Sequence, residues 1–301
     1  MNDLTPAALL NPPPTQWPPY EGYGNGHSAL HGAQLKLFQD LDRMFLTWAA
    51  QANAVEYQFP SMIPARELNK IGYFKSFPHH FTYPGSLDGE QKNLADFVSR
   101  DSLDADGRLQ LANCACAPVE DVLTPAACYH FYANFQGEAL TAPRYVTTRA
   151  TCYRKETHYE PLRRQWSFSM REIVCIGTSA EVTAFLDTRR AAVAALFNDI
   201  GLPINWDGAT DPFFNPAGNP KYLAQKLDPV KTEMVFGGDL AIGSVNFHRN
   251  YFGEAFKISR EGEDAYSGCI AFGLDRWIAA ITTHFGDDPA NWPDLGKRVS
   301  A

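Results

Sequence analysis

The sequence predicts an α+β fold in which one antiparallel sheet is flanked by helices. Three observations support this prediction: strand-type runs dominate the middle of the chain, amphipathic helical patterns stand on either side of them, and no internal repeat or linker divides residues 30–301. The 301 residues are 45% hydrophobic and 20% charged, which is close to the globular average. This composition excludes disordered, collagen-like and disulfide-scaffold proteins.

Three stretches have the three- and four-residue apolar spacing that is typical of helices. The first covers roughly 33–52. The second begins at a capping box formed by Thr178 and Glu181 and ends at Gly201, and the third runs from about Leu274 to His284. These are the helices expected to cover the sheet.

Short runs rich in β-branched and aromatic residues, bounded by polar, Gly or Pro breaks, predict the strands. They are Val55–Phe59, Phe131–Phe135, Arg144–Cys152, Gln165–Met170, Ile173–Ile176, Thr232–Phe236, Leu240–Val245 and Cys269–Phe272. Residues 207–220, in which Gly, Pro, Asn and Asp dominate, are expected to form a loop.

The first 28 residues are rich in Pro and Gly, and we expect an extended N-terminal arm without regular structure. They lack the basic region and long apolar run of a signal peptide, and no apolar run in the chain reaches the roughly 18 residues that span a bilayer. We therefore expect a cytoplasmic protein that does not enter a membrane. The net charge of −8 argues against a broad nucleic-acid surface but is compatible with a local basic pocket.

The six cysteines include no C-x-x-C pair, which argues against a zinc finger or a thioredoxin-like motif. In a cytoplasmic chain they are expected to be reduced thiols, and buried cysteines commonly act as small apolar side chains. From spacing alone, Cys114 and Cys116 would be the first metal ligands to consider.

The densest polar cluster lies between two strand-type runs, where residues 151–164 read TCYRKETHYEPLRR and the chain returns through Trp166 and Phe168. Arginine binds phosphate through paired hydrogen bonds, and an aromatic face can stack on a purine. The cluster therefore predicts either a polyphosphate site or an exposed hairpin with surface ion pairs. A second segment, Gly268–Arg276, joins a Gly-rich strand to a helix but has neither a P-loop nor a Rossmann pattern.

Taken in order, three segments resemble the signature motifs of class II aminoacyl-tRNA synthetases. Residues 59–64 (FPSMIP), after a long helix, resemble motif 1, the dimer-interface segment. Arg154-x-Glu156 followed by Phe168 resembles motif 2, and Gly268–Arg276 resembles motif 3. The motifs lie about 100 residues apart, and three in order are far more specific than any one. The resemblance implies a class II catalytic core and a homodimer.

The same resemblance implies roles for the motif residues in binding ATP. Arg154 would bind the α-phosphate and the amino-acid carboxylate, and Glu156 the adenine amino group. Phe168 would stack on adenine, and Arg276 would hold the γ-phosphate or stack opposite. Arg154 and Arg276 would be the catalytic residues, acting with Mg²⁺ on the charge that develops on the phosphates.

A closer resemblance is to methanogen-type seryl-tRNA synthetases and their short bacterial homologues, the amino acid:[carrier protein] ligases. It rests on residues 123–128 (LTPAAC), 171–174 (REIV) and 267–269 (SGC). That family holds a catalytic zinc ion with two Cys and one Glu, which implies Cys128, Glu172 and Cys269 here. Three protein ligands leave a fourth position for the substrate amine. Cys114 and Cys116 are then expected to be structural.

Further residues follow from the same resemblance. Lys231 and Glu233 resemble the segment before the amino-acid loop, where either charge could reach the amino acid or ATP, although an exposed strand edge would look the same. Ser244 and Asn246 resemble the floor of the amino-acid pocket. His248 is expected to be structural, and His79 and His80 to lie on the surface.

The resemblance covers nearly all of the chain from about residue 33, so we expect a catalytic domain over 29–301 with a helical insertion at about 179–220. Arg189 and Arg190 of that insertion would meet an acidic carrier protein or simply form a solvated helix face.

Only the Pro-rich arm precedes the catalytic domain, where seryl-tRNA synthetases carry a tRNA-binding domain. The sequence therefore predicts that a small amino acid, first glycine and then alanine or serine, is activated with ATP. The acceptor would be the phosphopantetheine thiol of an acyl or peptidyl carrier protein rather than tRNA. The alternatives are tRNA aminoacylation with a tRNA-binding element supplied in trans, and a catalytically inactive regulatory binding protein.

Overall fold

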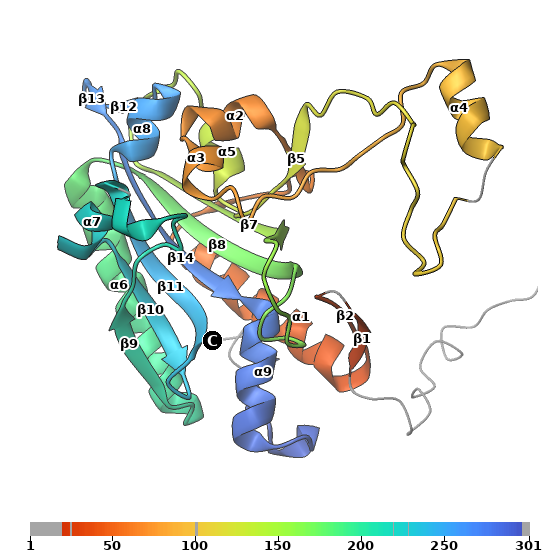
Figure 1. Ribbon diagram of the computed structural model, residues 1–301. Coiled ribbons are helices and arrows are strands. Elements are labelled where there is room, and N and C mark those ends of the chain that lie inside the picture. The colour runs from red at the N-terminus through yellow and green to blue at the C-terminus, as the bar shows by residue number, and fades with distance from the viewer. Residues whose placement is uncertain (1–19, 25, 100–101, 219, 228, 297–301) are drawn as a thin grey trace, which may run out of the picture.

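The computed structural model describes residues 20–24, 26–99, 102–218, 220–227 and 229–296 (Figure 1). Its centre is a seven-stranded sheet with the strand order β3-β7-β8-β14-β11-β10-β9. Every neighbouring pair in it is antiparallel except β3 and β7, which are parallel. The strands are β3 (Val55–Tyr57), β7 (Arg144–Tyr153), β8 (Ser167–Gly177), β9 (Ile204–Gly208), β10 (Lys231–Phe236), β11 (Leu240–Arg249) and β14 (Tyr266–Gly273).

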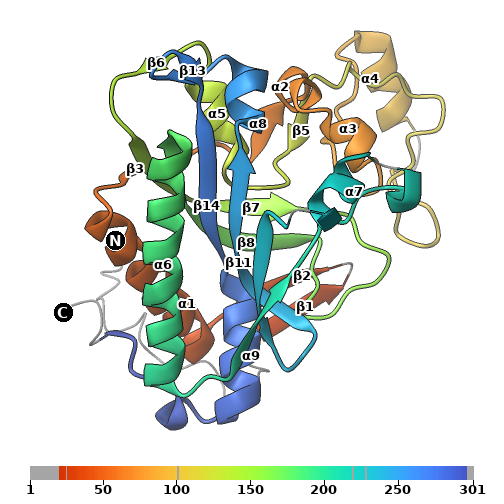
Figure 2. The ribbon, with the colours of Figure 1, turned by 90° about the vertical axis from the view of Figure 1, so that its left-hand side faces the viewer.

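Helices cover both faces of this sheet (Figures 1 and 2). On one face, the three long helices α1 (Gly32–Gln51), α6 (Ser179–Ile200) and α9 (Leu274–Phe285) build a core with the inner strands. On the other face a second core contains four short helices: α2 (Ala65–Lys70), α3 (Tyr73–Ser76), α5 (Tyr129–Asn134) and α8 (Tyr251–Phe256).

The remaining elements are short. Three small sheets pair β1 (Tyr20–Gly24) with β2 (His27–Leu30), β4 (Met62–Pro64) with β5 (Asp121–Leu123), and β12 (Ser259–Arg260) with both β6 (Ala139–Leu140) and β13 (Glu263–Asp264). Helix α4 (Gln91–Val98) stands away from the sheet in Figure 1. The others are α7 (Pro220–Leu227) and the 3₁₀ turns η2 (Pro216–Gly218) and η3 (Pro289–Asn291). No helix in the described part of the chain is long and apolar enough to cross a membrane.

The long helices are where their sequence signals predict them. In α6 the Thr178 hydroxyl accepts from the Glu181 amide while the Glu181 carboxylate accepts from the Thr178 amide, which is the predicted capping box. Gly201 ends the helix with φ 69°, a left-handed conformation that glycine adopts without steric cost. Helix α6 lies close against β14 because Gly268 has no side chain: a Cβ there would be 2.8 Å from Val182 Cγ1.

Several sequence predictions differ from the structure. The predicted strand Phe131–Phe135 belongs to α5, and the two predicted strands 165–170 and 173–176 are one strand, β8. The predicted loop at 207–220 begins inside β9 and reaches α7, so the insertion at 179–220 contains a strand as well as helix α6. Sequence position alone does not reveal that β9 can pair with β10 at the sheet edge.

The predicted N-terminal arm is partly wrong. Residues 1–19 lie outside the described residues, but β1 pairs antiparallel with β2 instead of lacking regular structure. The hairpin is held to the body by Gly26, whose carbonyl accepts a hydrogen bond of 2.9 Å from the Trp166 amide, and by the stacking of His27 on Trp166. The β1–β2 hairpin therefore packs on Trp166, the residue directly before β8.

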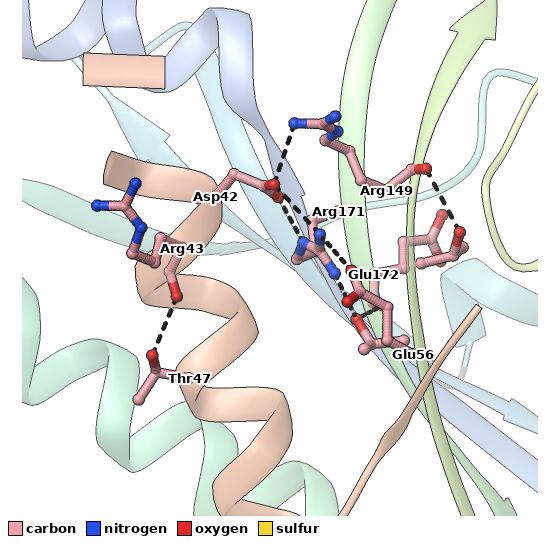
Figure 3. A network of polar contacts seen from close by, with 9 residues as sticks. Asp42, Arg43, Thr47, Glu56, Arg149, Arg171 and Glu172 are labelled. Carbon is pink, nitrogen blue, oxygen red and sulfur yellow. Dashed lines mark hydrogen bonds and ion pairs between the residues drawn. The ribbon is translucent and has the colours of Figure 1, made fainter. Parts of the chain in front are cut away.

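A buried arginine joins α1 and β3 to β8 (Figure 3). Arg171, 2% exposed, places its Nε 2.5 Å from Asp42 Oδ1 and its Nη2 2.9 Å from Glu56 Oε1. Asp42 also accepts from Arg149 at 3.1 Å. A buried guanidinium is stable only where such partners replace its water.

Replacing Arg171 with Met should lower the free energy of unfolding by about 3 kcal/mol, because Asp42 and Glu56 lose their buried partner. The matched variant Arg149→Met removes a cation that is 47% exposed in its side chain, and it should cost less than about 1 kcal/mol. Urea denaturation of both variants checks this, and equal losses would contradict it.

Candidate active site

A cavity of ≈ 420 Å³ opens on the sheet face that carries α2, α3, α5 and α8. Its size is that of a small-molecule site. All eleven residues that the sequence proposes for ATP, amino-acid and metal binding line it: Cys128, Arg154, Glu156, Phe168, Glu172, Lys231, Glu233, Ser244, Asn246, Cys269 and Arg276. They come from six separate stretches of the chain, so the fold brings together what the sequence keeps apart.

The β7–β8 hairpin positions Arg154. The hairpin closes with a hydrogen bond of 2.9 Å from the Arg154 amide to the Trp166 carbonyl. The Arg154 side chain donates from Nε to the Pro125 carbonyl at 2.9 Å, and its guanidinium lies over the Phe168 ring, 5.2 Å from the centroid. These two contacts fix the Arg154 guanidinium at the cavity wall, where it can bind an anion such as a phosphate.

Arg276 approaches the same space from the first turn of α9. Its Nε donates to the Arg163 carbonyl at 2.7 Å and its Nη1 to the Ala241 carbonyl at 2.9 Å. Burial lowers the pKa of Arg276, and the nearby Arg154 and Arg164 cations lower it further. A buried cation beside other cations is stabilised by an anion, so this half of the cavity suits a polyphosphate.

Carboxylates surround Lys231 on the opposite wall. Lys231 Nζ lies 3.0 Å from Glu233 Oε1 and 3.3 Å from Asp211 Oδ1, while Gln225 donates to Asp211 Oδ2 at 2.9 Å. Burial alone would raise the pKa of Asp211, but Lys231 and Gln225 outweigh it and hold that pKa below its usual value. The residues after β9 therefore close over the cavity, and Phe213 stacks on Phe77 of the α3 side.

Two thiols and a carboxylate meet at the deep end of the cavity. Cys128 stands at the start of α5, Glu172 in β8, and Cys269 in the neighbouring β14. Glu172 Oε1 accepts from the Ala127 amide at 3.1 Å, and Asn246 Nδ2 lies 3.3 Å from Cys269 Sγ. Hydrogen bonding to Cys269, burial and the Glu172 carboxylate raise the pKa of the Cys128 thiol well above its usual value.

The donor set suits zinc, since thiolates and a carboxylate are its usual ligands and three of them leave an open position. Among the described residues, no three His, Cys, Asp or Glu side chains already have the arrangement that holds a metal ion. Binding would displace the thiol protons and the Glu172 hydrogen bond, as metal binding to protonated ligands does. The residues therefore fit zinc chemically.

Other residues of the cavity were not predicted from the sequence. Tyr73, Tyr129 and Asp211 line it without belonging to a recognisable motif, and Asp275 lies in the motif 3 segment, which gave it no role. His80 was expected on the surface but is 7% exposed and lines the cavity. The sequence could not place it, because a His-His pair after Phe-Pro has no periodicity from which to infer burial.

The remaining cysteine and histidine predictions have mixed outcomes. Cys114 is half-buried and Cys116 exposed, and neither lines the cavity. All six cysteines lie in the described part of the chain and are free thiols. His248 is held between Tyr132 and Ser267, as a structural residue would be. Its Nε2 also lies 3.6 Å from Cys269 Sγ, so it stands beside one of the two thiols.

The two arginines considered for a carrier contact have partners within the protein. Arg189 donates to the Trp48 carbonyl at 3.1 Å, and Arg190 lies over the Trp206 ring at 4.8 Å. Both anchor α6 to its surroundings.

Comparison with known proteins identifies the family. Residues 119–285 match the tRNA synthetase class II core domain (G, H, P, S and T). The chain is 34% identical over 256 residues to amino acid–[acyl-carrier-protein] ligase 1 of Bradyrhizobium diazoefficiens, covering 82% of this chain and 77% of that protein. The chain belongs to the amino acid–[acyl-carrier-protein] ligase family, and it is an enzyme of the ligase class.

More distant relatives place this ligase among the synthetases. It is 25% identical over 296 residues to the type-2 serine–tRNA ligase of Methanothermobacter thermautotrophicus, covering 92% of this chain but 55% of that protein. The structure of M. kandleri seryl-tRNA synthetase in complex with A. aeolicus tRNASec has a TM-score of 0.77 at 20% identity, covering 93% of this chain and 57% of that one. The predicted α+β class II core is therefore confirmed.

If Arg276 receives a phosphate, Arg276→Ala should weaken binding of Mg²⁺–ATP about 10- to 100-fold, because a charge-assisted hydrogen bond is lost. Isothermal titration calorimetry measures this directly. Arg144→Ala removes a cation of the same kind that is paired with Glu138 and does not line the cavity, and its affinity should stay within about threefold. A normal affinity in Arg276→Ala would remove it from the ATP site.

Proposed function

We propose that this ligase activates glycine, and less readily alanine or serine, with ATP and transfers the aminoacyl group to the phosphopantetheine thiol of an acyl or peptidyl carrier protein. Membership of the family makes it a carrier-protein aminoacylating ligase in general terms. The observation that carries the finer proposal is that one cavity joins the Arg154–Phe168–Arg276 wall to the Cys128–Glu172–Cys269 corner. The first suits a nucleotide, and the second suits an amine-binding metal ion.

The proposed reaction has two steps. A carboxylate oxygen of the amino acid attacks the α-phosphorus of ATP and pyrophosphate leaves; the carrier thiol then attacks the carbonyl carbon and AMP leaves. Arg154, between ATP and the amino acid, would bind the α-phosphate of the first and the carboxylate of the second. Arg276 with Mg²⁺ would neutralise charge on the phosphates. Glu156 and Phe168 would hold adenine, and Glu233 would contact ATP.

The amino acid would lie between the thiols and Lys231. We propose that Cys128, Glu172 and Cys269 hold one zinc ion, which when bound would orient the substrate amine. Ser244 and Asn246 form the floor: Asn246 donates to Ser244 Oγ at 3.0 Å and faces Cys269. Phe252 and His248, which is 3.6 Å from Cys269 Sγ, line the cavity at this end, and Tyr132 packs behind them, stacked on Phe252 at 4.0 Å. Bulky side chains there favour a substrate with a very small side chain.

We also propose that the ligase forms a homodimer and that tRNA is not its partner. It would work in the cytoplasm, where ATP is available. Exposed apolar side chains near the motif 1 segment support the dimer: Val55 in β3 is 58% exposed and Met62 in β4 is 44% exposed. A second copy of the chain would cover these two apolar side chains. The proposed domain limits remain 29–301 for the catalytic unit, following the N-terminal segment.

Amino-acid-dependent exchange between ATP and pyrophosphate, measured for all twenty amino acids, should be fastest with glycine. Radiolabelled amino acid should then transfer to a phosphopantetheinylated carrier protein and not to the same carrier without its phosphopantetheine or to tRNA. Label on tRNA alone would indicate a synthetase that obtains its tRNA-binding element in trans. An absence of exchange with every amino acid, in zinc-replete protein, would indicate an inactive binding protein.

The zinc proposal predicts about one zinc ion per chain by elemental analysis. Cys128→Ser and Cys269→Ser should each lower zinc content below about 0.1 per chain and reduce exchange by at least about 100-fold. Cys116→Ser, an exposed cysteine outside the cavity, is the matched control and should retain both. Loss of zinc in the control with retention in the other two would reassign the site.

A further inference from the structure

The transfer half of the proposed reaction needs a proton acceptor. A free thiol has a pKa of about 8.5, so the carrier thiol is mostly protonated near pH 7 and its proton must leave as sulfur attacks. The acceptor must be a side chain that lines the cavity.

The carboxylates in the described part of the cavity are all engaged. Glu156 pairs with Arg164 at 3.0 Å, and both Asp211 and Glu233 pair with Lys231. Asp275 accepts from the Ser169 amide at 2.6 Å and from Gln165 at 3.2 Å. The last, Glu172, accepts from the Ala127 amide and belongs to the proposed zinc ligands. These partners occupy the carboxylate oxygens and favour the charged form, although burial raises the pKa of Asp275 above its usual value.

His80 differs from them. Its Nδ1 lies 3.0 Å from the Lys155 carbonyl oxygen, which can only accept, so Nδ1 carries the hydrogen and Nε2 the lone pair. Nε2 is buried and, within the described residues, has no hydrogen-bond partner. Among cavity-lining residues only Gln165 Oε1 is likewise buried without a partner, and an amide oxygen does not take up a proton near neutral pH.

The backbone fixes this imidazole in place. The Lys155 amide donates to the His80 carbonyl at 2.9 Å, so two hydrogen bonds tie His80 to the residue between Arg154 and Glu156. Two residues further on, the Thr82 hydroxyl accepts from Trp166 Nε1 at 2.8 Å. His80 is therefore part of the same rigid wall as the nucleotide-binding hairpin.

We propose that His80 is the general base of the transfer step, an inference that rests on the proposed function. The carrier S–H gives its proton to His80 Nε2, the sulfur forms a bond to the carbonyl carbon of the aminoacyl-adenylate, and the bond from that carbon to the phosphate oxygen breaks. AMP leaves with the electron pair, a thioester forms, and the imidazolium returns its proton to solvent.

The surroundings of His80 keep its imidazole in the neutral form, which can accept a proton. Burial and the neighbouring His79 lower its pKa below 6.5, and Arg154 lowers it further, while the Lys155 hydrogen bond and Glu156 act in the opposite direction. The imidazole is consequently neutral at pH 7, and its protonation at lower pH should slow transfer.

The test separates the two half-reactions. The aminoacyl-adenylate is formed on the enzyme with the amino acid preferred in the exchange assay, and pantetheine is then added as the thiol while AMP release is followed from pH 6 to 9.5. His80→Asn keeps a donor for the Lys155 carbonyl but lacks Nε2. It should keep exchange within about threefold of the wild type and lose about 100-fold in transfer at pH 7. His158→Asn, at an exposed histidine that does not line the cavity, should change neither.

The pH dependence distinguishes a base from a structural residue. The defect of His80→Asn should shrink to less than about threefold at pH 9.5, where the thiol is largely ionised and needs no base. His80→Gln should behave like His80→Asn. Normal transfer in both variants, or equal losses in exchange and transfer at all pH values, would overturn the proposal. If the wild type passed its adenylate to no thiol at all, the proposed function itself would fail.

Discussion

The buried guanidinium of Arg171 fixes α1 and β3 to β8, and the next residue along that strand, Glu172, faces the cavity on the other side of the sheet. Successive side chains of a strand point to opposite faces. One residue of β8 therefore closes the core between sheet and long helices while its neighbour contributes to the site. The same alternation holds in β14, where Cys269 faces the cavity side and Ile270 packs into the core of α1, α6 and α9. A shift of one residue in either strand would exchange the two faces and destroy both core and site.

The antiparallel register then sets which polar groups meet. Asn246 pairs with Cys269, while Glu172 pairs with Ala271, so the amide and the thiol stand level on adjacent strands and the carboxylate lies two residues along, on the same face. The proposed nucleotide-binding wall lies at the start of β8, where the β7–β8 hairpin ends and α9 begins beside it. Because β8 runs through both halves of the cavity, it would hold a bound phosphate and a bound amine at a fixed separation.

Much of the fold could be predicted from the sequence, and the eleven residues proposed for the site line one cavity; the two results have different reasons. Long helices and strands have a clear period, and the capping box at Thr178 fixes a helix start within one residue. The site residues came from motif resemblance, since spacing alone would have favoured Cys114 and Cys116 over Cys128 and Cys269. The failures are local: Phe131–Phe135 has strand-type composition but is too short to show a period, and α5 packs it as a helix. Asp211 and His80 were missed because their burial depends on the closing of distant loops.

The strand order has a consequence for how the chain is synthesised. β14 occupies the middle of the seven-stranded sheet yet comes last of its strands along the chain. Until residues 266–273 leave the ribosome, β8 and β11 each lack the neighbour that finally lies between them, and their unpaired edges are open to other strands. Pairing β8 with β14 also closes a loop of high contact order, which slows folding. The nascent ligase therefore exposes unpaired strand edges until its central strand is made, and during that interval aggregation competes with folding.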